Sequence, residues 1–219
     1  MDGTEFFPVF AVFFLGALLF VVWPRARAES LPKYATLIHD AFKECAFQNL
    51  SVRAFSPDDS LFCRKLHTDL FDAGFSPDIG FNYFDDWLKA DESQKWIVCS
   101  DSQRVACFGL NEFPDLRYAQ LSYGLMELEC RSKGLGSFAL AYRLWSLNPS
   151  GNYVVSLWAT EHSRPYFIRF GFVEMDQELL VPEERFPDLY HMSVVVSPED
   201  RSFLASYVAR NLGDTIADV

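Results

Sequence analysis

The hydrophobic pattern divides the chain into an N-terminal apolar run and a longer stretch in which strand and helix periods alternate. From Phe6 to Trp23 eighteen consecutive residues carry no charge. As an α-helix this run would be about 27 Å long, close to the ~30 Å hydrocarbon core of a bilayer. Trp23 would then lie at the membrane interface, followed by the basic Arg25 and Arg27. Residues 6–23 are therefore predicted to form a transmembrane helix.

The flanks of this run leave two processing outcomes open. Asp2 and Glu5 make the start acidic, whereas a secretory signal peptide starts with positive charge and has a shorter apolar region. Against this, Ala26-Arg27-Ala28 resembles a small-x-small cleavage site. If the run is not cleaved, the positive-inside rule places its basic flank in the cytoplasm. We expect residues 1–30 to be a single-pass membrane anchor, with the C-terminal domain in the cytoplasm.

Helical and strand periods follow the anchor. Apolar residues at helical spacing predict an amphipathic helix over Pro32–Phe47, which defines a linker segment at residues 31–49. The next expected elements are a strand at Leu50–Phe55, a helix opened by capping residues at 57–60 and closed by Gly74, and a short helix at Phe81–Leu88.

The middle of the chain turns to strands and then alternates strand with helix. The expected elements are a hairpin of Lys95–Ser100 and Arg104–Leu110, a strand at Tyr118–Leu128, a helix at Gly136–Leu147, a strand at Tyr153–Thr160, a helix at Arg164–Phe170, and a strand at Tyr190–Val196. Ser197 to Asp200 would cap a final helix that ends before Gly213. A strand-helix-strand unit implies a parallel pair. The fold class is therefore α+β: an antiparallel meander that becomes a mixed sheet, in a domain at residues 50–197, with an appended helix and tail at 198–219.

Composition narrows the possible partners. The formal net charge of −11 argues against nucleic acid, whose phosphates would be repelled, and favours cationic ligands such as amines. The five cysteines show no C-x-x-C spacing, which argues against a disulfide framework or a zinc site. No metal is expected.

Candidate chemistry lies at residues 131–137, where the period changes from strand to helix. Gly134 and Gly136 let the backbone approach a ligand, and the free N–H groups and dipole of a helix's first turn favour an anion. Arg131 and Lys133 add positive charge. The spacing does not fit the GxxxxGK[ST] phosphate loop. We expect an anion site of another kind here.

Arg131, Gly134 and Gly136 fit the R/Q-x-x-G-x-G/A signature of the GNAT superfamily of N-acetyltransferases, and residues 50–196 resemble that superfamily in the order of elements. A second block, Arg164–Phe172, resembles its later helix-to-strand segment. The resemblance implies that an acyl-CoA, most often acetyl-CoA, binds where the fourth and fifth strands splay apart, and that the acyl group passes to a primary amine by direct attack. The implied cofactor-binding residues are Leu125, Met126, Leu128, Arg131, Ser132, Lys133, Gly134, Leu135, Gly136 and Ser137.

Direct attack requires a neutral amine, and a lysine-like amine with a pKa of ~10.4 is mostly protonated at neutral pH. A base must therefore remove a proton. Glu127 and Glu129 stand at the end of the strand that would flank the thioester, and strand alternation would place both on one face. Either could be the base, with Glu127 preferred as the deeper one; the alternative is a solvated pair that only balances nearby positive charge. His162 is a further candidate base.

The sequence departs from the superfamily pattern at the general acid. The tyrosine that often protonates the departing thiolate is replaced by Phe167, and Tyr166 stands one residue earlier. The asparagine common before this helix is replaced by Thr160. Because one helical residue turns a side chain by about 100°, either a register shift brings Tyr166 into place or the thiolate leaves without an acid.

Taken together, these patterns predict a membrane-anchored N-acyltransferase, with Glu127, Glu129 and Tyr166 as candidate catalytic residues. One alternative is a catalytically degenerate module of the same fold that binds acyl-CoA or a partner protein without turnover. Another is an enzyme with a long-chain acyl donor. The acceptor site implied by the resemblance is rich in carboxylates that would suit a cationic amine: Asp69, Asp72, Asp78, Asp85, Asp86, Glu183, Glu184 and Asp188.

Overall fold

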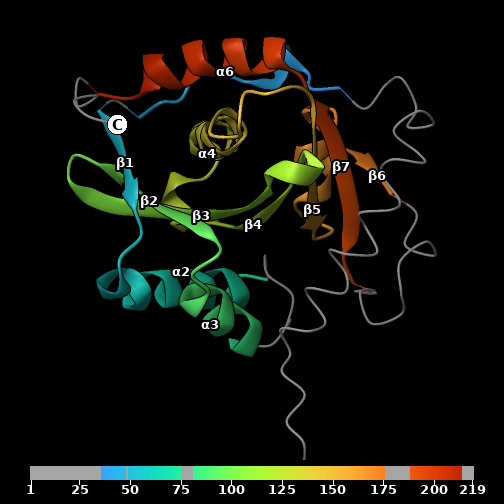
Figure 1. Ribbon diagram of the computed structural model, residues 1–219. Helices are drawn as coiled ribbons and strands as arrows, with labels where there is room; N and C mark the ends of the chain where they lie inside the picture. The colour runs from blue at the N-terminus through green and yellow to red at the C-terminus, as the bar shows by residue number, and fades with distance from the viewer. Residues whose placement is uncertain (1–35, 48, 75–80, 176–187, 214–219) are drawn as a thin grey trace, which may run out of the picture.

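A computed structural model describes residues 36–47, 49–74, 81–175 and 188–213 (Figure 1). Seven strands form one sheet: β1 (Leu50–Ala54), β2 (Gln94–Ser100), β3 (Gln103–Phe113), β4 (Tyr118–Met126), β5 (Tyr153–Ala159), β6 (Val173–Glu174) and β7 (Tyr190–Val196). The α-helices are α2 (Ser60–Asp72), α3 (Phe81–Lys89), α4 (Leu135–Trp145), α5 (Arg164–Arg169) and α6 (Pro198–Asn211). Short 3-10 helices lie at η1 (His39–Ala41), η2 (Pro57–Asp59), η3 (Pro114–Leu116) and η4 (Leu128–Cys130).

The helices cover the sheet in layers. Figure 1 shows α2 and α3 on one face and α4 on the other, with α6 lying over α4. Strand β2 explains the two faces, because its side chains alternate: Val98 belongs to the cluster under α4 and α6, whereas Ile97 and Cys99 belong to the cluster under α2 and α3. The sheet is thus buried from both sides.

The sheet opens between its fourth and fifth strands. The strand order is β1-β2-β3-β4-β5-β7-β6, and β4–β5 is the parallel pair in it. This pairing covers only Tyr118–Gln120 against Val154–Ser156. Beyond Gln120, β4 stays paired with β3 as far as Met126, and β5 stays paired with β7. Among the described residues, one edge of β4 therefore has no strand partner over residues 121–126.

A β-bulge lies in this open stretch of β4. Phe108 pairs with Gly124 and Gly109 with Ser122, so Tyr123 is an extra residue, and its φ is 20°. A bulge bends its strand and increases the local twist. This bulge lies three residues beyond Gln120, the last residue of β4 that pairs with β5.

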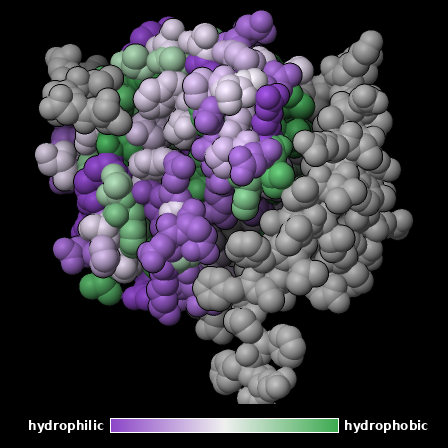
Figure 2. Space-filling view, in the orientation of Figure 1, coloured by the Kyte–Doolittle hydropathy of each residue, from purple (hydrophilic) through white to green (hydrophobic). Residues whose placement is uncertain are grey.

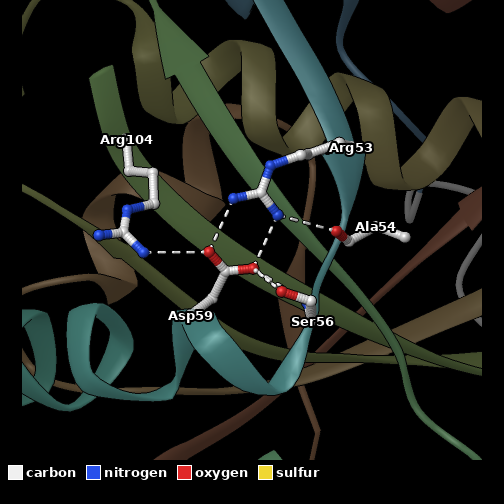
Figure 3. A network of polar contacts seen from close by, with 5 residues as sticks. All are labelled: Arg53, Ala54, Ser56, Asp59 and Arg104. Carbon is white, nitrogen blue, oxygen red and sulfur yellow. Dashed lines mark hydrogen bonds and ion pairs between the residues drawn. The ribbon is translucent and has the colours of Figure 1, made fainter. Parts of the chain in front are cut away.

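The buried carboxylate of Asp59, at the start of α2, forms hydrogen bonds with two strands of the sheet (Figure 3). Asp59, 1% exposed, accepts two hydrogen bonds of 2.7 Å from Arg53 of β1 and one of 3.2 Å from Arg104 of β3. The backbone N–H of Ser56 also donates to it at 2.9 Å. The Arg53 hydrogen bonds hold the pKa of Asp59 well below its usual range. The start of α2 is thereby tied to two strands.

The prediction of a helix at Pro32–Phe47 is wrong over the described residues 36–47, where the only helical turn is η1. The backbone finds tertiary partners instead: the Ile38 N–H donates to the Phe170 carbonyl at 3.0 Å, and the Ala46 N–H to the Lys133 carbonyl at 2.8 Å. Of the apolar side chains, Leu37 and Phe42 are buried whereas Ile38 is 46% exposed, and Phe42 packs edge-on against the Phe170 ring at 4.6 Å. Tertiary contacts override the local pattern here.

The other expected strands and helices are confirmed, with two differences in the sheet. Strand β4 ends at Met126 and not at Leu128, because residues 128–130 turn into η4. The two-residue strand β6 was not expected. Helix α6 begins with the expected cap, in which the Ser197 hydroxyl accepts from the Asp200 N–H. It is part of the main core and not an appendage, since Leu204, Tyr207 and Val208 are buried in it.

The expected transmembrane helix at residues 6–23 lies outside the described residues. Within the ranges that the structure describes, no helix has the length and apolarity needed to cross a membrane.

Candidate active site

The site is built around the N-terminus of α4. Gly134 caps this helix with a left-handed φ of 87°, and a Cβ there would lie 2.6 Å from the Glu44 carbonyl oxygen. Only glycine fits this position. Within the described part of the chain, no side chain caps this helix, so the first-turn N–H groups of Leu135, Gly136 and Ser137 have no intrahelical or capping partner there. These amides and the helix dipole make an anion site.

Positive charge lies on the loop that leads into the helix. Lys133 is exposed, and its ammonium lies 5.9 Å from the centre of the Phe47 ring. Arg131 is half-buried, and burial lowers the pKa of its guanidinium. Ser132 between them has a φ of 61°. The loop thus adds cationic groups to the helix end, as the sequence predicts for an anion site.

The opening in the sheet meets this helix end at Gly136. A Cβ on Gly136 would lie 3.3 Å from the Met126 Cε and 3.4 Å from the Tyr166 hydroxyl oxygen. Met126 is the last residue of the open edge of β4, and Tyr166 comes from α5, which follows β5. The helix N-terminus, the unpaired strand edge and a phenol therefore converge at one place.

Tyr166, and not Phe167, points toward this place. Its hydroxyl is buried and has no hydrogen-bond partner among the described residues, although the Ser137 side chain lies close by. Burial raises the pKa of Tyr166 to about 12, and the nearby Arg143 guanidinium partly opposes that rise. Phe167 instead packs edge-on against Phe172 at 5.5 Å. A hydroxyl that stays protonated is thus held beside the start of α4.

The candidate bases lie at the end of β4, on the side of α2. Glu129 is exposed and Glu127 is half-buried. Burial raises the pKa of Glu127, the Glu129 charge raises it further, and Lys65 of α2 lowers it. The two carboxylates are therefore neighbours, but not through strand alternation, because Glu129 lies in η4. Leu128 between them is 44% exposed.

Two further predicted residues, Leu125 and His162, lie in different surroundings. Leu125 contributes its backbone to the open edge, while its side chain is buried under α2 and α3. His162 is exposed in the turn before α5. Across residues 36–47, 49–74, 81–175 and 188–213, no three His, Cys, Asp or Glu side chains gather in a way that could hold a metal ion.

One residue near the site was missed by the sequence reasoning. Arg143 of α4 is only 5% exposed and lies beside Gly124 of β4. The available signal was a single charged residue within an otherwise uncharged helix, Gly136–Leu147. A charge in an apolar helix that contacts a sheet is a candidate for function, since arginine is rarely buried without a partner.

Compared by sequence, the chain matches no protein-family model and no curated protein. Compared by structure, it is similar to a GNAT-family acetyltransferase from Staphylococcus aureus, with a TM-score of 0.55, 13% identity, and coverage of 67% of this chain and 98% of that one. It is similar to N-acetylglutamate synthase from Neisseria gonorrhoeae, solved with coenzyme A and N-acetyl-glutamate, with a TM-score of 0.52, 16% identity, and coverage of 70% and 36%. It is also similar to a chimera of the spermidine N-acetyltransferase of Vibrio cholerae, with a TM-score of 0.50, 15% identity, and coverage of 74% of this chain and 99% of that one. These similarities show that the chain has the GNAT fold.

Proposed function

We propose that this protein is an N-acyltransferase that transfers an acyl group, most simply acetyl, from acyl-CoA to an amine. The observation that carries the proposal is the convergence at Gly136 of an uncapped helix N-terminus, the open edge of β4 and the Tyr166 hydroxyl. The GNAT fold supports the same activity, as does the coenzyme A bound in the Neisseria gonorrhoeae enzyme.

The geometry fits the parts of an acyl-CoA. The first-turn amides of Leu135, Gly136 and Ser137 suit the pyrophosphate, and the two cationic side chains of the loop add attraction. The edge of β4 up to Met126 offers N–H and C=O groups to the amides of the pantetheine arm, as an added strand would use them. The thioester would then lie beside the bulge at Tyr123.

The transfer consists of one nucleophilic attack accompanied by three proton transfers. Glu127 removes a proton from the ammonium form of the acceptor, and the neutral nitrogen attacks the thioester carbonyl carbon. The new C–N bond forms, the C–S bond breaks, and the sulfur leaves with the bonding electron pair. Tyr166 gives its proton to the thiolate, and the second proton that the nitrogen loses restores the Tyr166 hydroxyl, while Glu127 releases its proton to solvent. The products are an amide and free CoA.

The acceptor is proposed to be a cationic amine that approaches from the side of α2 and α3. The described carboxylates on those helices are Asp69, Asp72, Asp85 and Asp86. Figure 2 shows mainly hydrophilic residues over α3 and a mixture of hydrophilic and hydrophobic residues over α2. Glu129 of η4 and Asp69 of α2 both lie close enough to raise the pKa of Glu127. The spermidine acceptor named for the Vibrio cholerae enzyme is a polycation of this kind. Asp78, Glu183 and Glu184 lie outside the described residues.

A second candidate function is acyl-CoA binding without turnover. Two departures from the superfamily pattern favour it: Phe167 stands where a tyrosine is usual, and Thr160 stands where an asparagine is usual. Both candidates are tested by measuring thiol release from acetyl-CoA in the presence of a panel of amines that includes polyamines, amino acids and a lysine peptide. Amine-dependent thiol release is expected. Saturable acetyl-CoA binding without release over the whole panel would favour the second candidate. Absence of binding would exclude both.

We also propose that residues 6–23 anchor the protein in a membrane, with the acyltransferase domain in the cytoplasm. The support is the uncharged run and the basic residues after it. The full chain, expressed in cells, is expected to stay with membranes after alkaline carbonate extraction, whereas a variant without residues 1–30 is released. Release of the full chain would contradict the proposed anchor, and protease accessibility in sealed vesicles tests the orientation.

A further inference from the structure

Arg143 is a buried cation whose hydrogen bonds among the described residues go to two backbone carbonyls and to no carboxylate. Its Nε donates to the Ala139 carbonyl at 3.2 Å, and its Nη1 donates to the Ser122 carbonyl at 3.4 Å. The guanidinium carbon lies 5.6 Å from the centre of the Phe108 ring. No hydrogen bond is made by Nη2 among the described residues, and Arg143 takes part in none of their ion pairs.

The contrast with Arg201 shows what is missing. Arg201 is also 5% exposed, and its Nε and Nη1 have no hydrogen-bond partner among the described residues, but its Nη2 donates to two carbonyl oxygens at 2.9 and 2.6 Å. Burial lowers the pKa of its guanidinium, and the charges of Asp200 and Glu112 partly oppose that fall. Around Arg143 no described carboxylate has that effect, and burial lowers its pKa to about 10. Two carbonyls and an aromatic face do not neutralise a buried charge.

The location of the guanidinium relates this charge to the proposed donor site. A Cβ on Gly124 would lie 3.4 Å from Nη2 and 3.7 Å from Nη1, so the guanidinium lies directly over this glycine of the open β4 edge. Gly124 adjoins the bulge at Tyr123 and is exposed. The charge is also close enough to Tyr166 to influence its pKa. Arg143 therefore faces the same opening as the candidate acid.

The helix gives the direction in which a donor would extend. Gly136 and Arg143 are seven residues apart on α4, a rise of about 10.5 Å along the axis. A donor with its pyrophosphate at the helix N-terminus and its arm along β4 runs antiparallel to that strand, from Met126 toward Gly124. Its acyl group would thus end beside Arg143, on the α4 side of β4. The proposed acceptor approaches from the opposite side, under α2 and α3.

We propose that Arg143 binds a carboxylate at the far end of the acyl group, so that the preferred donor is a dicarboxylic acyl-CoA of the malonyl or succinyl class. This inference rests on the proposed function. A guanidinium pairs with a carboxylate through two parallel hydrogen bonds, and its Nη atoms over Gly124 are the ones available for them. In a chain with a net charge of −11, an anionic acyl group needs such a local cation.

The test uses two stable CoA thioethers of matched shape, one with a carboxypropyl group and one with a butyl group, titrated calorimetrically into the full chain. The carboxypropyl thioether is expected to bind at least about ten-fold more tightly to the wild type. Arg143→Met should abolish or invert this preference, and Arg143→Lys should restore part of it. The exposed Arg169, 5.4 Å from the Tyr166 ring centre, provides the control, because Arg169→Met should leave the preference unchanged.

The outcomes separate this inference from the function on which it rests. If CoA itself does not bind the wild type, both fall. If CoA binds but the two thioethers bind alike, or if Arg143→Met keeps the preference, only the assignment of Arg143 falls. The carboxylate bound by Arg143 could instead belong to the acceptor. This is tested by comparing rates of thiol release from acetyl-CoA with amines that carry a carboxylate and amines that do not. A carboxylate preference on the acceptor, lost in Arg143→Met, would overturn the acyl assignment.

Discussion

At the scale of single residues, the proposed chemistry depends on two titratable groups whose surroundings differ. Tyr166 is enclosed next to the start of α4, whereas Glu127 is half-buried at the end of β4 beside other carboxylates. Burial favours the neutral form of both groups and so raises both pKa values. A phenol that keeps its proton and a carboxylate with increased basicity are suited to the acid and base roles.

The substitution Tyr166→Phe tests the acid. The variant is expected to lose about ten- to hundred-fold in kcat for thiol release, less than the largest general-acid effects because a thiolate leaves readily. Stability should stay equal or rise slightly, since a buried hydroxyl without a hydrogen-bond partner is removed. The loss should be constant between about pH 7 and pH 10, because a group with a pKa of about 12 keeps its proton there. Unchanged kcat in a folded variant would remove Tyr166 from the chemistry.

The substitution Glu127→Gln tests the base. The carboxylate must be ionised to accept a proton, so wild-type kcat/KM should fall as the pH falls through the raised pKa of Glu127. That acidic limb should lie above the ordinary carboxylate range and should disappear in the variant, whose rate is expected to be at least about a hundred-fold lower. Glu129→Gln is the matched control, expected to move the limb to lower pH by removing a neighbouring negative charge. An acidic limb that survives in Glu127→Gln would contradict the assignment.

At the scale of elements, the buried carboxylate of Asp59 joins β1, β3 and the start of α2. Asp59→Asn should lower the free energy of unfolding by about 1–3 kcal/mol, measured by urea denaturation. The half-exposed Arg53 and Arg104 can turn to solvent, which limits the loss. Asp85→Asn, which breaks the exposed pair with Arg64, should change it by less than about 0.5 kcal/mol.

The pH dependence of this difference follows from the sign of the pKa shift. The folded-state pKa of Asp59 is depressed. Its contribution is therefore fully present above the unfolded value of about 3.9 and is lost as the pH falls through the folded value. The difference between wild type and Asp59→Asn should be constant near neutral pH and shrink only in strong acid. A difference that disappears by pH 5 would contradict the buried ion pairs.

Most elements could be predicted because their patterns agree with their packing. The alternation in β2 and the apolar run in β5 match the faces that they bury, and Ser197 and Asp200 cap α6 as their identities suggest. The prediction failed where tertiary contacts decide. Residues 36–47 have helical spacing, yet their N–H groups bond to α5 and to the α4 loop.

The site could be predicted only in part, for the same reason. Gly134 and Gly136 could be placed because a helix N-terminus is a local feature. The direction of Tyr166 could not, since it depends on how α5 packs against α4. Arg143 was missed because the contacts that make it a candidate are with Gly124 and Ser122. These residues are distant in sequence, and only the packing of α4 on the sheet brings them close to it.

At the scale of the whole molecule, the ends of the described chain complete the core and the site. Phe42 packs against Phe170, Phe203 and Tyr207, and the Tyr207 hydroxyl donates to the Lys43 carbonyl at 2.5 Å. The same segment reaches the loop before α4, where the Ala46 N–H bonds to Lys133. The stability of the domain and the shape of the proposed pyrophosphate site are therefore coupled through residues 36–47.

Phe42→Ala measures this coupling. The variant should lose about 3–5 kcal/mol of unfolding free energy through the cavity that it leaves, and its acetyl-CoA affinity should fall as the segment against Gly134 loosens. Leu61→Ala is the control, since Leu61 is 77% exposed and its truncation should change neither quantity noticeably. A destabilised Phe42→Ala with wild-type affinity below its unfolding transition would show that the segment supports the fold but not the site.

The most direct test of the proposed CoA site is a calorimetric titration of acetyl-CoA into the wild type and two variants at Gly136. The wild type should show one saturable site with micromolar affinity. Gly136→Ala should keep it, since the superfamily signature allows alanine there. Gly136→Val should weaken it at least about ten-fold while leaving the protein folded, because side-chain atoms beyond a Cβ already 3.3 Å from the Met126 Cε would fill the space next to the helix N-terminus. No binding to the wild type, or equal binding to Gly136→Val, would contradict the site.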